Sequence, residues 1–195
     1  MKTFFTSDPH FDDPRLNLFG RDILFDTARQ VDNHIIKRWN KTVSQEDEVF
    51  VLGDAALSKK GLQKFSRLNG KKILIKGNYD EPETAKYKVS GKLLRKYFDF
   101  VVDTGEIEIT LIDGTKETVF LNHFPTLCKK DMFNITGHIH GLWKVQRNMI
   151  NVGLDAWHFT PVSEERIAFQ INGIRNHYDQ NVFAGELYAN SYGYF

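Results

Sequence analysis

The chain has very little cysteine and no long apolar run. Among its 195 residues Cys128 is the single cysteine, which excludes an internal disulfide and any metal site built from several thiolates. No apolar stretch approaches the ~18 residues that a membrane-spanning helix needs. The first ten residues, MKTFFTSDPH, lack the apolar core of a secretory signal. We therefore expect a cytoplasmic protein without a membrane partner.

The chain also has almost no net charge. Its 26 Lys and Arg against 25 Asp and Glu give +1 at neutral pH, so no overall field attracts nucleic acid. The lysine pairs at 59–60, 71–72 and 129–130 are scattered, and no basic stripe is interleaved with aromatic residues. We expect no long nucleic acid as a partner, whereas nucleotides and short oligonucleotides stay candidates. Composition leaves the oligomeric state open.

The remaining composition is that of a soluble globular protein. Hydrophobic residues make up 41% and charged residues 26%, and the 16 Phe indicate a core packed with aromatic rings. The length and the absence of a linker or repeat favour a single domain over residues 1–195. Within it, the Tyr-, Asn- and Gly-rich tail 176–195 is predicted to be an accessory strand or a contact segment.

Strands and helices alternate in the first half of the chain. Short apolar runs predict buried strands, and apolar residues at spacing four predict a helix that Asp26 caps. Residues 11–25 show little periodicity and are expected to form a loop. The predicted strands are 3–7, 48–54 and 72–78, and the predicted helices are 26–40, 59–68 and one or two within 82–97.

The second half of the chain is mostly strand-like. Asp113-Gly114 predicts a hairpin turn, and Ser163 is a candidate N-cap for a last helix. The whole order predicts an α/β fold in which a mixed sheet faces a second, largely antiparallel sheet, with helices outside. The predicted strands here are 100–104, 106–112, 117–123, 133–140 and 149–155.

Polar side chains recur at the points where the predicted strands end. In an α/β sheet the loops beyond the carboxyl ends of the strands meet in one crevice, so residues distant in sequence can converge there. Each short motif alone is weak evidence for a site, because Asp and Gly are common in turns. Their conjunction, in chain order and at strand ends, is much stronger. The residues are Asp8, His10, Asp54, Asn78, His123, His138 and His140.

These residue types indicate metal binding. Histidine and carboxylate ligands without thiolate suit Mn²⁺, Fe, Zn²⁺ or Ni²⁺. Seven ligands are too many for one ion that keeps an open position, and they suit two ions that share a bridging carboxylate. Two ions ~3.5–4 Å apart can stabilise the attacking and the leaving oxygen of phosphoryl transfer, and a water between them gains hydroxide character. We therefore expect two divalent cations as cofactors, with Mn²⁺ favoured.

The same motifs resemble those of the calcineurin-like metallophosphoesterases. The ordered set of that family matches DPH, GD, GNYD, NH and GHIH here, and NVGLDAWHFTPVS resembles the end of a small bacterial and phage branch. The resemblance implies a four-layer α/β/β/α sandwich and a dinuclear phosphoesterase. It implies one metal on Asp8, His10, Asp54 and His140, and another on Asp54, Asn78, His123 and His138, with Asp54 as the bridge.

One position departs from the family pattern. Where the family usually has a histidine that assists the leaving group, this sequence has Tyr79, followed by Asp80, whose family counterpart orients that histidine. A phenol is a poorer proton donor than an imidazolium at neutral pH, although it can still donate a hydrogen bond. Neutral drift and substrate tuning both explain the change. We favour a phosphodiesterase acting on a phosphodiester or cyclic nucleotide, with a broad phosphomonoesterase or a non-catalytic scaffold as alternatives.

Other residues near the motifs are candidate substrate contacts. Arg21 follows the first motif and could reach the phosphate of a small phosphorylated substrate, such as a nucleotide. His158 could replace the missing imidazole if its loop approaches the site, and otherwise packs beside Trp157 and Phe159. Asp155 is predicted to hold a loop rather than a metal.

Overall fold

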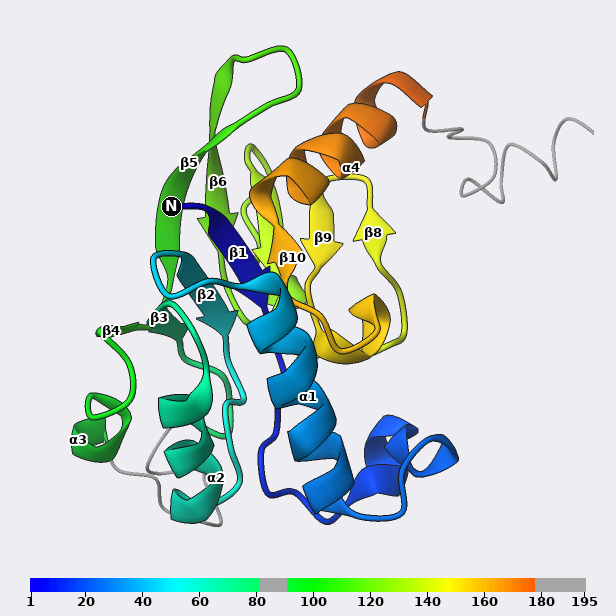
Figure 1. The fold of residues 1–195 in the computed structure, drawn as a ribbon. Coiled ribbons are helices and arrows are strands. Elements are labelled where there is room, and N and C mark those ends of the chain that lie inside the picture. The colour runs from blue at the N-terminus through cyan, green and yellow to red at the C-terminus, as the bar shows by residue number, and fades with distance from the viewer. Residues whose placement is uncertain (81–90, 178–195) are drawn as a thin grey trace, which may run out of the picture.

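The computed structural model describes residues 1–80 and 91–177. Two five-stranded sheets face each other, and helices flank them (Figure 1). In the first sheet β1, β2, β3 and β4 are parallel, and β10 pairs antiparallel with β1. In order across the sheet its strands are β10 (Val162–Ser163), β1 (Thr3–Thr6), β2 (Glu48–Leu52), β3 (Lys71–Ile75) and β4 (Phe100–Val102).

The second sheet is also mixed. The pairs β5–β6 and β8–β9 are antiparallel, whereas β6–β7 and β7–β9 are parallel. The expectation of a largely antiparallel second sheet is therefore wrong. The chain crosses back to the end of the sheet where β6 begins before it forms β7, and it does so again before β9, so these strands pair in parallel. Its strands, in order, are β5 (Gly105–Thr110), β6 (Lys116–Leu121), β7 (Phe133–Thr136), β9 (Met149–Asn151) and β8 (Val145–Gln146).

Helices lie against the sheets on both sides of the described fold. Helices α1 and α2 cover the first sheet, and α4 contacts β1, β10 and β5 (Figure 1). The predicted α/β class with two sheets flanked by helices is confirmed. The α-helices are α1 (Ala28–Thr42), α2 (Lys59–Gln63), α3 (Gly91–Leu94) and α4 (Glu164–His177), and the 3₁₀ helices are η1 (Leu16–Phe19), η2 (Arg21–Ile23), η3 (Lys64–Arg67), η4 (Pro125–Leu127) and η5 (Leu154–Trp157).

Two hydrophobic cores lie on the two faces of the first sheet. Successive side chains of a strand point to opposite faces, so an apolar run without alternation is buried on both. In β1, Phe4 packs in the core under the helices, whereas Phe5 packs in the core between the sheets. Val49 and Phe50 of β2 divide in the same way. The continuous apolar runs in the sequence therefore follow from burial on both faces.

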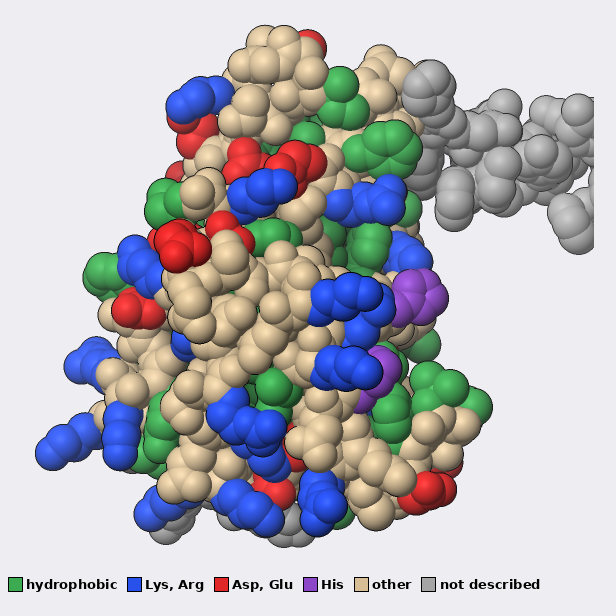
Figure 2. Space-filling view, in the orientation of Figure 1, with side chains coloured by type: hydrophobic (Ala, Val, Ile, Leu, Met, Phe, Trp, Pro, Cys, Tyr) green, Lys and Arg blue, Asp and Glu red, His purple; other side chains and the backbone are tan. Residues whose placement is uncertain are grey.

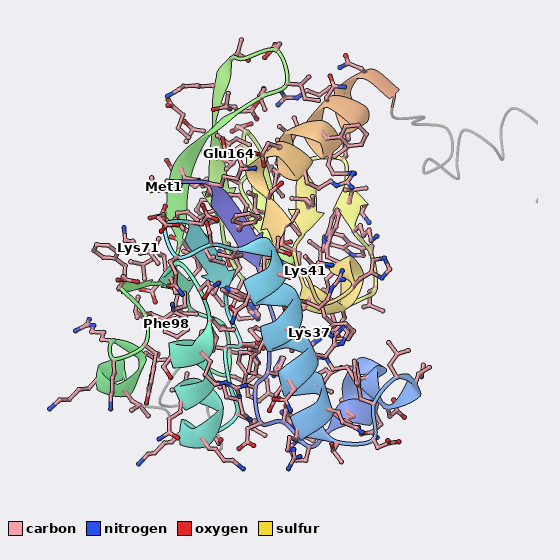
Figure 3. All side chains as sticks on the ribbon, in the orientation of Figure 1. Met1, Lys37, Lys41, Lys71, Phe98 and Glu164 are labelled. Atoms are coloured by element: carbon pink, nitrogen blue, oxygen red, sulfur yellow. The ribbon has the colours of Figure 1, made fainter. Side chains whose placement is uncertain are left out.

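Helix α1 shows where the local prediction failed by one residue. Thr27, not Asp26, is the N-cap, because the Thr27 hydroxyl accepts from the Gln30 amide while the Gln30 side chain accepts from the Thr27 amide. Asp26 accepts only from the Gln30 side chain at this end. Lys37 and Lys41 lie on the outer side of α1 (Figure 3), opposite the apolar stripe that includes Trp39.

Several other predictions can be compared with the described residues. The hairpin is confirmed, although its turn spans 111–115 and is longer than Asp113-Gly114 alone. The predicted helix 59–68 divides into α2 and η3, and the predicted loop 11–25 contains η1 and η2. Most of the predicted helical segment 82–97 and of the tail 176–195 lies outside the described residues.

The distribution of basic side chains and the character of the helices can be compared with the expectations on nucleic acid and membranes. Figure 2 shows lysine and arginine side chains distributed in separate groups over one face of the molecule. In the part of the chain that the structure describes, no helix has the length and apolar composition needed to cross a membrane.

Candidate metal centre

The carboxyl ends of strands from both sheets meet at one edge of the sandwich. The chain leaves β1 at Ser7, and Ser7 forms a bridge to Gly153 in the segment that follows β9. The Asp8 amide donates to the Gly53 carbonyl at 3.1 Å, and the Gly137 amide donates to the His123 carbonyl at 3.0 Å. The two amide bonds join neighbouring strand ends within each sheet, and the Ser7–Gly153 bridge joins one sheet to the other, so the motifs predicted to converge do lie in one place.

Asp8, His10 and His140 form the first cluster. One ligand atom from each lies within 4.8 Å of the others. Asp8 Oδ1 is 3.8 Å from His10 Nε2 and 4.0 Å from His140 Nε2. Asp8 and His10 are almost fully buried, whereas His140 is partly exposed. The cluster could hold one metal ion with an opening on the His140 side.

Asp54, His123 and His138 form the second cluster, again with ligand atoms within 4.8 Å of one another. His123 Nε2 lies 3.2 Å from His138 Nδ1 and 3.1 Å from Asn78 Oδ1. The amide oxygen of Asn78 is thus next to a ring nitrogen of the cluster, which places a fourth candidate ligand beside it.

Asp54 lies between the two clusters. Its Oδ2 atom is 3.5 Å from His10 Nε2 in the first cluster and 3.5 Å from His123 Nε2 in the second. Its other oxygen, Oδ1, accepts a hydrogen bond from the Tyr79 amide at 2.9 Å, which fixes the orientation of the carboxylate. One carboxylate oxygen therefore faces ligands from both clusters.

The backbone at this edge is strained. Eight non-glycine residues have positive φ in the described part of the chain, and five of them belong to the clusters. Such conformations cost of order 1–3 kcal/mol each and persist where the surroundings determine them, commonly at functional sites. The clustering of these conformations marks the strand ends as a candidate functional site, independently of the ligand types. The five are Asp8, His10, Asp54, His138 and His140.

Two glycines permit the close packing of the clusters. Gly53 has a φ of +86°, and a Cβ atom there would collide with the His123 ring and with the Gly77 backbone. A Cβ atom at Gly77 would collide with the Asp54 carboxylate. The glycines of the GD and GNYD motifs therefore allow the β2 and β3 loops to touch beneath the second cluster.

Hydrogen bonds on the far side of the imidazoles fix their orientation. His123 Nδ1 donates to the Leu52 carbonyl at 2.7 Å, and His140 Nδ1 donates to Asp155 Oδ2 at 2.9 Å. In both rings Nε2 then faces the cluster as an unprotonated ligand atom once the ring is neutral. Asp155 was predicted to hold a loop, and the structure gives it a second role, since it orients the cluster residue His140.

Burial and neighbouring charges shift the pKa values of the cluster residues in opposite directions. Burial lowers the pKa of His10 to about 3 and raises the pKa of Asp8. Burial would also lower the pKa of His123, but its contacts with the Asp54 and Asp8 carboxylates raise it to about 9. Without a cation, His123 carries the proton that compensates these carboxylates.

Unsatisfied buried atoms test whether the clusters suit a metal. Within the described residues, four buried side-chain N or O atoms have no hydrogen-bond partner, and three of them are Asp8 Oδ1, His10 Nδ1 and His10 Nε2. A buried polar atom without a partner is costly, and a metal ion would satisfy the Asp8 oxygen and one His10 nitrogen. The donor set of imidazoles, carboxylates and one amide therefore fits divalent cations.

Tyr79 and Asp80 have different surroundings from those expected. The Tyr79 hydroxyl accepts from Arg15 Nη1 at 2.9 Å, and its ring packs edge-on against His10 at 5.1 Å. Asp80 does not orient the Tyr79 hydroxyl. It is buried and accepts from the amides of Asp54, Ala55 and Gly77, so it joins the β2 and β3 loops. Burial and the neighbouring Asp54 carboxylate raise the pKa of Asp80 to about 7.

Arg21 is not available as a phosphate contact. It is only 2% exposed and donates to both oxygens of Asp155 at 2.7 and 3.0 Å. It also donates to the carbonyls of Asp8 and Pro9 at 2.7 and 3.0 Å. The guanidinium of Arg21 is therefore occupied by acceptors within the protein. Its bonds to the Asp8 carbonyl and to Asp155 support the first cluster on the side away from the ligand atoms.

His158 does not replace the missing imidazole. It is exposed and lines a cavity of about 730 Å³ together with Lys2, Arg38 and Arg166, a cavity that none of the cluster residues lines. Its φ of +54° ends η5. Trp157, one of the two residues beside which His158 was expected to pack, lines the same cavity.

Three residues at the site were missed by sequence reasoning. Asp13 is buried and forms an ion pair with Arg15, and Phe19 stacks on His10 at 4.6 Å and on His140 at 4.4 Å. The sequence signal for Asp13 and Arg15 was their closeness to the DPH motif. Residues that follow a candidate ligand by a few positions can still contact it in the fold.

Comparison with known proteins identifies relatives of this chain in sequence and in structure. No family model matches the chain. The Uncharacterized protein MJ1445 of Methanocaldococcus jannaschii is 27% identical over 177 residues, which cover 85% of this chain and 89% of that protein. The crystal structure of the protein of unknown function AQ665 from Aquifex aeolicus aligns with a TM-score of 0.61 at 21% identity, over 87% of this chain and 99% of that one. That likeness shows a shared fold.

Two bacteriophage proteins are more similar in sequence. The Gene 66 protein of Mycobacterium phage L5 is 31% identical over 183 residues, covering 80% of this chain and 87% of that protein. The Gene 66 protein of Mycobacterium phage D29 is 30% identical over 162 residues, covering 69% and 81%. The chain therefore belongs to the family of the mycobacteriophage Gene 66 proteins.

Proposed function

We propose that the protein is a dinuclear metal-dependent phosphoesterase. The observation that carries the proposal is the position of Asp54 Oδ2, which is 3.5 Å from a histidine nitrogen in each of the two clusters. A carboxylate in that position suits a bridge between two cations, and paired cations are a common solution for displacement at phosphorus. The motif resemblance to the metallophosphoesterases supports the same conclusion.

The chain's own residues would divide the work. Asp8, His10 and His140 would hold one ion, His123, His138 and Asn78 would hold the other, and Asp54 would contribute to both. Divalent cations bound there would supply Lewis acidity towards a phosphoryl oxygen and would lower the pKa of a coordinated water.

The supporting shell keeps these ligands in place. Asp155 and the Leu52 carbonyl keep the Nε2 atoms of His140 and His123 directed at the cations. The pKa of His10, which burial lowers to about 3, keeps this ring neutral and able to coordinate at any physiological pH.

We further propose a preference for phosphodiesters, including cyclic nucleotides, over alkyl monoesters. Tyr79 packs its ring edge-on against His10, and a hydroxyl assists a leaving oxygen by donating a hydrogen bond rather than by full proton transfer. Aryl and strained cyclic leaving groups need less assistance than alkoxides do. Broad phosphomonoesterase activity is the alternative within the same site.

A non-catalytic scaffold of the same fold is the second candidate. It would bind metals weakly and hydrolyse nothing. The presence of all seven candidate metal ligands argues against it, because a pure scaffold has no need of a full ligand set.

The test combines metal content with hydrolysis. Purified protein is analysed for bound metals and assayed on bis-p-nitrophenyl phosphate with Mn²⁺, Ni²⁺, Zn²⁺ or Fe²⁺ added. We expect the wild-type protein to hydrolyse this substrate and Asp54→Ala to be inactive. A panel of cyclic nucleotides, dinucleotides and mononucleotides then determines the substrate preference. A folded protein that is inert with every metal and substrate would contradict the proposal and favour the scaffold.

A further inference from the structure

We propose that Arg15, acting with the Tyr79 hydroxyl, is the contact that binds the substrate's phosphoryl oxygens. This inference rests on the proposed phosphoesterase function and adds the residue that recognises the anion. A pair of cations can polarise a phosphoryl group, but an ester must also be held in one orientation for the displacement. Arg15 is positioned to provide that orientation.

Asp13 fixes the Arg15 guanidinium in a rigid pose. Arg15 Nε donates to Asp13 Oδ1 at 2.9 Å, and Nη2 donates to Asp13 Oδ2 at 2.6 Å. The Arg15 amide also donates to Asp13 Oδ1 at 3.0 Å. The Asp13 side chain is 1% exposed, so the ion pair does not move freely with solvent. A guanidinium held along one edge by two bonds to the same carboxylate is ordered before a ligand arrives.

The other edge of Arg15 faces the GNYD loop. Its Nη1 atom donates to the Tyr79 oxygen at 2.9 Å. Since that oxygen accepts the bond from Arg15, the hydroxyl hydrogen is free to be donated to another acceptor. The Tyr79 ring lies against His10, and its amide is bonded to Asp54, so the pair adjoins ligands of both clusters.

Comparison with Arg21 separates a contact residue from a structural one. Both arginines form an ion pair with a carboxylate beside the first cluster. Arg21 is 2% exposed and its guanidinium is held by Asp155 and two backbone carbonyls, whereas the Arg15 side chain is 32% exposed. Three of the five N–H bonds of Arg15 are used within the described residues, which leaves two for a ligand. Guanidinium groups with two free donors suit phosphate oxygens.

The Asp13 pairing has a structural role as well, because an unpaired buried carboxylate would be costly. That role does not require the arginine to reach Tyr79 or to stay one third exposed. A lysine at position 15 would neutralise Asp13 but would lack the planar fork that joins Asp13, Tyr79 and an anion at once. Arg15→Lys therefore separates neutralisation of Asp13 from binding of the anion.

The test measures binding of inorganic phosphate to the metal-loaded protein by calorimetry. Arg15→Ala and Arg15→Lys are compared with Arg147→Ala, which removes the same charge from the exposed turn between β8 and β9. We expect the dissociation constant for phosphate to rise roughly tenfold to a hundredfold in Arg15→Ala and less in Arg15→Lys, with metal content unchanged. Tyr79→Phe should lower kcat for alkyl esters more than for p-nitrophenyl esters.

The outcomes distinguish this inference from the proposed function. If the wild-type protein hydrolyses esters but both Arg15 variants bind phosphate as tightly as Arg147→Ala, the inference is wrong and the phosphoesterase stands. If the wild-type protein binds metals and phosphate through Arg15 but hydrolyses no ester, the proposed function fails and the anion contact stands. Should Arg15→Ala fail to fold, the folded Arg15→Lys variant decides by the same measurement.

Discussion

His140 donates a hydrogen bond from Nδ1 to Asp155 Oδ2 at 2.9 Å, and Asp155 is held in turn by Arg21. Burial alone would raise the pKa of Asp155, but the His140 bond and the Arg21 charge lower it. The carboxylate is therefore ionised and keeps His140 Nε2 directed at Asp8. A residue outside the ligand set thus determines the orientation of a ligand.

The first prediction concerns that outer residue. Asp155→Asn should weaken binding of the metal ion assigned to Asp8, His10 and His140 by about 10–100-fold, the usual effect of removing a carboxylate behind a histidine ligand. Competition with a chromophoric chelator measures the affinity at a temperature where the variant is folded. Asp131→Asn, on the segment before β7, is the control for loss of one surface charge. Equal metal affinities in wild type and Asp155→Asn would contradict the role assigned to Asp155.

The second prediction is proton release on metal binding. The carboxylates of Asp54 and Asp8 raise the pKa of His123 to about 9, so the metal-free ring is protonated at pH 7.5 and must lose its proton to coordinate. Calorimetry in buffers of different ionisation enthalpy should detect about one released proton, and metal affinity should fall as the pH is lowered from about 9. Release that persists unchanged in His123→Ala would argue against this assignment.

The same shift predicts how the metal-free fold depends on pH. The pKa of His123 is raised from 6.5 in the unfolded chain to about 9 in the folded one, so folding favours the protonated ring. The resulting stabilisation is fully present below about pH 6.5 and is lost as the pH rises through about 9. Denaturant unfolding of chelator-treated protein between pH 6 and 10 measures it, and a stability difference from His123→Gln that does not shrink over this range would count against it.

A third prediction concerns Asp47, which directly precedes β2, at the opposite end of that strand from Asp54. Asp47 accepts from the Ser44 hydroxyl at 2.6 Å, the Ser44 amide at 2.9 Å and the Lys2 amide at 2.8 Å, and these bonds lower its pKa to about 2. A lowered carboxylate pKa stabilises the fold above the unfolded value near 4, and this contribution is lost as the pH falls through about 2. Asp47→Asn should therefore destabilise the protein at pH 6 but much less at pH 2.5. A difference in unfolding free energy that stays constant with pH would refute this.

A fourth prediction tests the close contact of the GD and GNYD loops. Gly53→Ala adds a Cβ atom that meets the His123 ring and places alanine at a φ of +86°. We expect a loss of metal binding together with a destabilisation of several kcal/mol, since overpacking alone costs about 1–3 kcal/mol and the conformation adds to it. Gly114→Ala, with a φ of +83° but nothing within 4 Å of the added atom, is the matched control for the backbone term. Equal metal affinity in the two variants would show that the loops are not closely packed.

Sequence patterns predicted the parts of the fold that depend on local periodicity. The runs TFFT, EVFVL and KKILI became β1, β2 and β3 because their uninterrupted apolar residues are buried on both faces of the sheet. The direction of β7 and β9 was not readable in the same way. Whether a strand pairs parallel or antiparallel depends on where the connecting chain returns, and no local pattern encodes that.

The candidate site shows the same division. The residues placed by strand ends, such as Asp54 and His123, could be found because ligand chemistry limits the residue types. Arg15 was signalled only by its closeness to the DPH motif, because a sequence does not show that its guanidinium joins Asp13 to Tyr79. Asp155 was expected only to hold a loop, because a sequence does not show that its carboxylate meets His140 and Arg21. Arg21 was assigned the wrong contact because a sequence does not show that its guanidinium turns inward to Asp155.

The central claim is that two cations share Asp54, and electron paramagnetic resonance of the Mn²⁺-loaded protein tests it most directly. Two ions bridged by one carboxylate should give the spectrum of a spin-coupled pair at two Mn²⁺ per chain. Asp54→Ala should abolish the coupling, whereas Asp131→Ala should leave it intact. A spectrum of isolated Mn²⁺ in the wild-type protein at full loading, or a stoichiometry of one, would contradict the account.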